Sequence, residues 1–170
     1  MVIVMMKRHF TFFLSFWLWM AIGGCATGIV SVSSPHYAKM ENDNYYFSIT
    51  PLSANERHCG FRLILKNKTA NPIFVDWNKT SYIHDNEYKG GFIFDSMNFE
   101  NRNDPKLIER VRARDIFIKT IWPGILAHGD LEQWTQMPME PGNHGVEVTI
   151  VMNGRTFTER LVVRISKLEK

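Results

Sequence analysis

Apolar and polar residues alternate with a period of two through most of the chain after Tyr45, and this period predicts β-strands. Tyr45, Phe47 and Ile49 begin the pattern, and Pro51 is expected to end the first strand. Further strands are predicted near positions 61–66, 73–78, 80–84, 91–95, 115–122 and 129–136.

The polar stretch 67–72 separates the strands predicted at 61–66 and 73–78. A short polar loop between two alternating runs is typical of an antiparallel hairpin, so these two strands are predicted to pair. Trp77 continues the apolar row of the second strand and is therefore predicted to lie in the core.

Asn153-Gly154 lies between two alternating runs, 146–152 and 155–165, and predicts a two-residue hairpin turn. Asn-Gly suits a type I′ turn because both central residues of that turn need positive φ. The turn sets a register in which Ile150 faces Phe157, so both strands place their apolar residues on the same face.

One charged residue interrupts the apolar row of this last hairpin. In the predicted register Glu159 falls opposite Val148. Two explanations stay open, because Glu159 could lie where the sheet edge meets water, or the register could slip at this point.

The stretch 97–114 has no sustained alternation and is predicted to be a long irregular or short helical insertion. Asp104-Pro105 could cap a short helix that carries Leu107, Ile108 and Val111 on one face. About eight short strands separated by turn residues predict an all-β fold, an antiparallel β-sandwich of immunoglobulin-like architecture. A small closed barrel is the alternative.

The N-terminal segment differs sharply from the rest of the chain. Lys7 and Arg8 precede an apolar run at positions 10–22, and no acidic residue occurs before Cys25. This order is typical of a secretory signal peptide, and the run is shorter than the roughly 20 residues that cross a bilayer. Ile22-Gly23-Gly24-Cys25 then follows, and this tetrapeptide resembles the lipobox of bacterial lipoproteins.

The resemblance implies that the thiol of Cys25 receives a diacylglyceryl group and that residues 1–24 are removed. The partner would be the lipid bilayer of the cell envelope. Ala26 resembles the outer-membrane default, with the chain facing the periplasm if the host is Gram-negative. An ordinary cleaved signal peptide and an uncleaved anchor helix are the alternatives. The predicted segments are a signal peptide at 1–24, lipidated Cys25 with a flexible tether at 25–44, and a β-sandwich domain at 45–170.

The charge balance changes once this leader is set aside. The whole chain has 170 residues, enough for one domain, with 20 Lys and Arg against 17 Asp and Glu. Removing Lys7 and Arg8 leaves 18 basic residues against 17 acidic ones, so the mature chain is close to neutral. This balance offers no electrostatic basis for nucleic-acid binding, and no nucleic-acid partner is predicted.

Motifs that carry chemistry are scarce. With Cys25 acylated, Cys59 is the remaining cysteine and is predicted to be a buried free thiol. Its neighbour His58 would point to the opposite face of a strand and so would not activate it. The histidines occur singly, without a metal-binding spacing. No catalytic residue, cofactor or metal ligand is therefore assigned, which favours a protein that is not an enzyme.

The segments 67–80 and 119–123 resemble small β-rich envelope lipoproteins whose activity is unknown. The predicted function is accordingly a membrane-anchored cell-envelope lipoprotein that acts as a binding or structural module, with an envelope protein as its partner. The alternative is an envelope hydrolase or metal-binding protein that uses loop histidines such as His84 and His128. A third hypothesis is an assembly factor whose exposed strand edge receives a strand of a partner.

Overall fold

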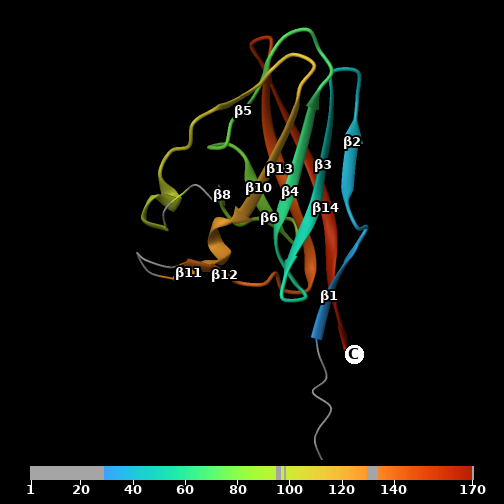
Figure 1. Cartoon of the computed structure of the whole chain (residues 1–170), viewed down its shortest axis with the longest axis vertical. Helices are drawn as coiled ribbons and strands as arrows, with labels where there is room; N and C mark the ends of the chain where they lie inside the picture. Colours follow the sequence, from blue (N-terminus) through green and yellow to red (C-terminus); the bar gives the residue numbers. More distant parts are fainter. Residues whose placement is uncertain (1–28, 95–96, 98, 130–133, 170) are drawn as a thin grey trace, which may run out of the picture.

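The computed structural model describes residues 29–94, 97, 99–129 and 134–169. They fold into two antiparallel sheets that pack face to face, so the predicted all-β sandwich is confirmed (Figure 1). The two large sheets share no strand among these residues, which distinguishes the fold from a closed barrel. None of the described residues belongs to a helix long and apolar enough to cross a membrane.

Sheet A follows the order β1, β14, β13, β5 and β9, with β6 also paired to β13 and β7 beyond β6. Its strands are β1 (Ile29–Ser34), β14 (Arg155–Glu169), β13 (Gly142–Met152), β5 (Ile73–Val75), β9 (Glu109–Val111), β6 (Ser81–His84) and β7 (Glu87–Tyr88). Sheet B follows the order β2, β3, β4, β10 and β8. Its strands are β2 (Ala38–Glu41), β3 (Tyr45–Ala54), β4 (Arg57–Asn67), β10 (Ile116–Pro123) and β8 (Phe92–Ile93).

Short elements complete the described part of the chain. The strand predicted at 129–136 is a small hairpin of β11 (Ala127–Gly129) and β12 (Trp134–Gln136), and residues 130–133 lie outside the described residues. One 3₁₀ helix, η1 (Phe99–Asn103), precedes β9, and another, η2 (Gly124–Leu126), directly follows β10.

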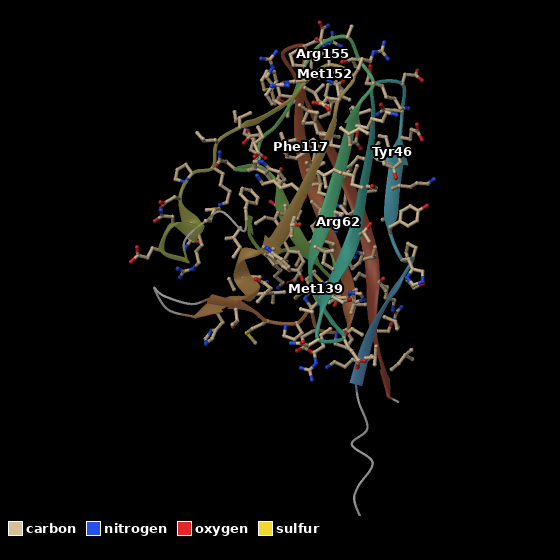
Figure 2. The ribbon with its side chains drawn as sticks, in the orientation of Figure 1. Tyr46, Arg62, Phe117, Met139, Met152 and Arg155 are labelled. Carbon is tan, nitrogen blue, oxygen red and sulfur yellow. The ribbon has the colours of Figure 1, made fainter. Side chains whose placement is uncertain are left out.

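The core lies between the two sheets and follows the predicted alternation. Its fully buried apolar side chains include Phe47, Ile49, Phe61, Leu63 and Leu65 from sheet B and Ile73, Val75, Val146, Val148 and Ile150 from sheet A. Each such side chain contributes about 1.5–3 kcal/mol relative to exposure. Trp77 is buried beside them, as predicted. Figure 2 shows Met152 near one end of the sandwich and Met139 near the other.

The predicted β13–β14 hairpin is confirmed in its register. Asn153 and Gly154 both have positive φ, 50° and 73°, and Ile150 pairs with Phe157. The register does not slip at Glu159, which pairs with Val148. Its carboxylate instead accepts a 2.5 Å hydrogen bond from the Tyr45 hydroxyl of sheet B, so this charged residue joins the two sheets at their edge.

The β-sandwich begins earlier in the chain than predicted. β1 pairs over its whole length with the end of β14, and β2 pairs with β3. The segment 29–44 is therefore largely part of the two sheets, and the tether predicted to reach Tyr45 is wrong. Serine-rich composition suggested a linker, but backbone hydrogen bonds to a neighbouring strand do not depend on apolar side chains.

The hairpin predicted from 61–66 and 73–78 is also wrong. β4 lies between β3 and β10 in sheet B, whereas β5 pairs with β13 and β9 in sheet A. The stretch 67–72 therefore crosses from one sheet to the other. Buried Asn67 fixes this crossing, because its amide donates to the carbonyl oxygens of Asn71, at 2.8 Å, and Arg112, at 2.9 Å.

No α-helix follows Asp104-Pro105 in the described stretch 99–129. The insertion at 97–114 contains η1 and then extends into β9, which pairs with β5. Val111 is buried while Leu107 and Ile108 are exposed, so the three side chains do not share one apolar face. Pairing with β5 supplies backbone hydrogen bonds along a whole strand, whereas a single helical turn is costly to nucleate.

β3 continues through Pro51 to Ala54, beyond the end predicted for it. β2 accompanies β3 only as far as Ile49, so β3 has no described strand beside it on that side at Pro51. A proline, which lacks the backbone N–H, is tolerated where a strand lies at a sheet edge.

Candidate functional site

β10 presents an unpaired edge in sheet B. On one side, residues 116–121 pair with β4. On the other side, β8 pairs only with Trp122 and Pro123, and no other strand among the described residues pairs with 116–121. Figure 1 shows β10 at the side of sheet B away from β2 and β3. The Ile116 N–H is taken by the Asp115 carboxylate at 2.8 Å, and the backbone groups farther along this edge can pair with another strand.

The outer face of β10 is unusually apolar for an exposed surface. Ile116 and Ile118 are 52% and 60% exposed, respectively. Trp122 lies on the same face over Gly60, where an added β-carbon would come within 2.2 Å of the indole. Gly60 is therefore required for the indole to lie flat against β4, because any side chain at this position would displace it.

A depression of about 450 Å³ adjoins this edge. Its walls come from Phe94 and Met97, from the extended segment that holds Leu107 and Ile108, and from Lys119 of β10. Leu107 is 87% exposed and Ile108 is 55% exposed, so the wall offers apolar side chains to a partner. The unpaired edge of 116–121 and this depression together are the β10 edge site.

A network of charged and aromatic groups holds the depression in shape. Glu109 of sheet A accepts hydrogen bonds from the Trp77 indole, at 2.6 Å, and from the Lys119 ammonium, at 2.5 Å. The ammonium also lies 4.0 Å from the centre of the Phe94 ring, a cation–π contact. The Glu109–Lys119 ion pair therefore connects the edges of the two sheets. Each side chain compensates the charge of the other at the margin of the core.

A second cluster of polar groups lies inside sheet A. The Tyr82 hydroxyl is 2.5 Å from Nδ1 of His144, and Nε2 of His144 is 2.6 Å from the Glu140 carbonyl oxygen. Because a carbonyl only accepts, Nε2 carries the proton and Nδ1 accepts from the hydroxyl. The ring of His84 stacks on that of His144, with the ring centres 4.4 Å apart.

Burial governs the titration of this cluster. Removal from water lowers the pKa of His144 to about 4 and raises the pKa of the Tyr82 hydroxyl. Both groups are therefore neutral near pH 7. Their hydrogen bonds are taken by each other and by the backbone. Tyr82 and His144 therefore stabilise the fold, and neither is an exposed base or nucleophile.

The structure describes Cys59 but not Cys25. Cys25 lies outside the described residues. Cys59 is buried and free, as predicted, with its sulfur 3.7 Å from the Leu52 carbonyl oxygen. Burial raises the pKa of this thiol, which disfavours the reactive thiolate. Nδ1 of His58 is hydrogen-bonded to the Ser53 hydroxyl at 2.8 Å rather than to the thiol.

The loop histidines are not brought together. His84 lies in β6 against His144, whereas His128 lies exposed in β11, and Asp130 falls outside the described residues. Across the ranges that the structure describes, no group of three or more His, Cys, Asp or Glu side chains could hold a metal ion. The hydrolase or metal-binding alternative therefore stays a prediction without a geometric basis.

The sequence raised an exposed strand edge as a hypothesis but did not predict which strand provides it. Glu109 and Lys119 belong to different sheets, so no local spacing links them. The one available signal was Leu107 and Ile108, two consecutive apolar residues in a polar stretch. Comparisons of the chain with protein-family models, curated proteins and solved structures find no match.

Proposed function

We propose that this chain is a lipid-anchored lipoprotein of the cell envelope whose β-sandwich binds a partner protein. The anchor is the acylated Cys25 that remains after removal of residues 1–24. In a Gram-negative host the domain would face the periplasm from the outer membrane. The observation that carries the binding role is the β10 edge site, with its unpaired strand edge and exposed isoleucines.

The anchor would hold the domain close to the bilayer. Three residues separate Cys25 from Ile29, where β1 begins. An extended chain spans about 3.6 Å per residue, so the acylated cysteine would lie within about 14 Å of β1. β1 begins at the same end of the sandwich as the C-terminus, and this end would face the headgroups (Figure 1).

The partner segment would be an extended polypeptide. Only another backbone offers N–H and C=O groups at the spacing that the edge of 116–121 requires. Alternate side chains of the added strand would lie on the outer face beside Ile116 and Ile118 or over the depression beside Leu107. The partner is therefore expected to carry apolar residues at every second position.

Replacing Cys25 tests the anchor. Cys25→Ser is expected to abolish labelling by a palmitate analogue and to raise the soluble fraction at least about tenfold, because the acyl chains supply the membrane affinity. Labelling and membrane fractionation measure both effects. Cys59→Ser is the matched control and should leave both unchanged. Membrane retention of Cys25→Ser would contradict the lipid anchor and indicate an uncleaved anchor helix.

Replacing Ile116 tests the binding edge. A photocrosslinking amino acid at Ile118 is expected to form a discrete protein adduct in the native envelope. Ile116→Asp should lower the yield at least about tenfold, because a charge would be buried against an apolar strand. The same substitution at exposed Leu168 of β14 is the control. Equal yields from the two variants would contradict binding at the β10 edge site.

A further inference from the structure

A second depression, of about 440 Å³, lies on the other side of the segment 105–106 from the β10 edge site. It is formed where the connection between β7 and β8 meets η1 and η2, and its wall includes Gly90 and Gly91. The two depressions share Pro105 and Lys106, but this one is also lined by the backbone of Gly90 and Gly91, whereas the other is lined by apolar side chains such as Leu107 and Ile108.

The wall carries an excess of positive charge. Lys89, Arg102 and Lys106 line it, and Asp104 is the one carboxylate among its described lining residues. Lys89 forms an ion pair with Glu87, which does not line the depression. A concave surface with this balance attracts small anions, because the low-dielectric walls focus the field of the cations.

Lys106 is the best-positioned of these cations. Its backbone is held by a reciprocal pair of 2.7 Å hydrogen bonds with the side-chain amide of Asn78. Its ammonium donates to two neutral acceptors, the carbonyl oxygens of Arg102 at 3.2 Å and Asp104 at 3.4 Å. An ammonium has three N–H groups, so one remains for a ligand. Burial also lowers the pKa of Lys106, an effect that an anion in the depression would reverse.

The glycines provide backbone donors on the same wall. The carbonyl oxygens of Gly90 and Gly91 accept hydrogen bonds from the N–H groups of Tyr82, at 2.7 Å, and Gly124, at 2.9 Å. These bonds hold the backbone in place, while the N–H groups of the two glycines have no partner among the described residues. A β-carbon at Gly90 would meet nothing within 4 Å, so a ligand can approach the backbone closely.

We propose that this depression binds a small organic anion through a carboxylate or phosphate group. The ammonium of Lys106 and the N–H groups of Gly90 and Gly91 would contact the anionic group. The site shares Pro105 and Lys106 with the wall of the β10 edge site. Binding of an anion here uses neither the open edge of β10 nor the lipid anchor, so it does not depend on the proposed function.

The test is a titration of the purified full chain in detergent micelles with inorganic phosphate and, separately, with acetate. Amide chemical shifts of Gly90 and Gly91 are expected to move saturably with at least one of the two anions. Saturation by phosphate alone assigns a phosphate ligand, and saturation by acetate alone or by both assigns a carboxylate-compatible site. No saturable shift with either anion would overturn the proposal.

Two variants show whether the binding is local. Lys106→Gln should weaken binding at least about tenfold, because it removes the charge but keeps a polar side chain. Gly91→Glu should abolish binding by placing a carboxylate on the wall, where a β-carbon has room, with its nearest neighbour 4.0 Å away. Lys66→Gln, at an exposed position of β4, is the control for charge alone. Equal weakening by Lys66→Gln and Lys106→Gln would overturn the proposal.

Discussion

The free energy of unfolding is expected to fall by roughly 3 kcal/mol between pH 7 and pH 4 through the protonation of His144 alone. In the folded protein this imidazole is buried, accepts from the Tyr82 hydroxyl and donates to the Glu140 carbonyl oxygen. A proton added at Nδ1 would place a charge in the core and turn the Tyr82 hydroxyl away from its present acceptor.

The direction of this pH dependence follows from the pKa values of His144 in the folded and in the unfolded chain. The pKa of His144 is about 4 in the fold, below the value of 6.5 for a free imidazole. The unfolded chain therefore binds a proton first as the pH falls. The contribution of His144 is fully present above pH 6.5 and is lost progressively as the pH approaches 4.

Urea denaturation at pH 7 and pH 4 measures this effect. His144→Gln is expected to reduce the difference between the two pH values, because the amide cannot be protonated. His58 is also buried with a lowered pKa and contributes in the same direction. The test therefore compares the pH dependence of His144→Gln with that of the unsubstituted protein. His128→Gln, at an exposed position, should leave the difference unchanged. An unchanged pH dependence in His144→Gln would contradict the assignment.

Asn67→Ala is expected to lower the free energy of unfolding by about 3 kcal/mol. The Asn67 side chain is fully buried and donates to the carbonyl oxygens of Asn71 and Arg112. Its own oxygen accepts from the backbone N–H and the hydroxyl of Thr69, at 2.9 and 2.8 Å. Alanine would leave these groups without their partners at the point where the chain crosses between sheets.

Thermal and urea unfolding of the variant measure this loss. Asn44→Ala is the matched control, because this asparagine is exposed in a neighbouring loop and should change stability by less than about 0.5 kcal/mol. Equal stabilities of the two variants would show that the crossing is held by other contacts. Amide exchange in β5 should also accelerate in Asn67→Ala, because this crossing leads directly into β5.

Local patterns predicted those features whose determinants lie close together in the chain. Asn153-Gly154 and the flanking alternation predicted the β13–β14 register, because the turn and the apolar face impose the same pairing. The burial of Trp77 followed in the same way from its position in an alternating run.

The sequence was a poorer guide to how the chain passes from one sheet to the other. A polar loop such as 67–72 is compatible with a hairpin or with a crossing, and the contact of Asn67 with Arg112 decides between them. β1 and β9 likewise owe their extended form to hydrogen bonds with distant strands. The short Val-Ser alternation of β1 lies in a serine-rich stretch, and β9 lacks a strong local strand signal, so the sequence pattern assigned these segments to a tether and a helix.

The all-β class and the last hairpin depend on short-range periodicity, so both could be predicted from the chain's own pattern. The linear motif that resembles a lipoprotein signal is likewise a property of the sequence. Which strand edge stays open, and which basic side chains surround a depression, depends on how distant segments pack in the folded protein. The β10 edge site depends on which strands lie beside β10, and the Lys106 depression on loops distant in the chain. Such properties arise from packing, which no local pattern of apolar and polar residues encodes.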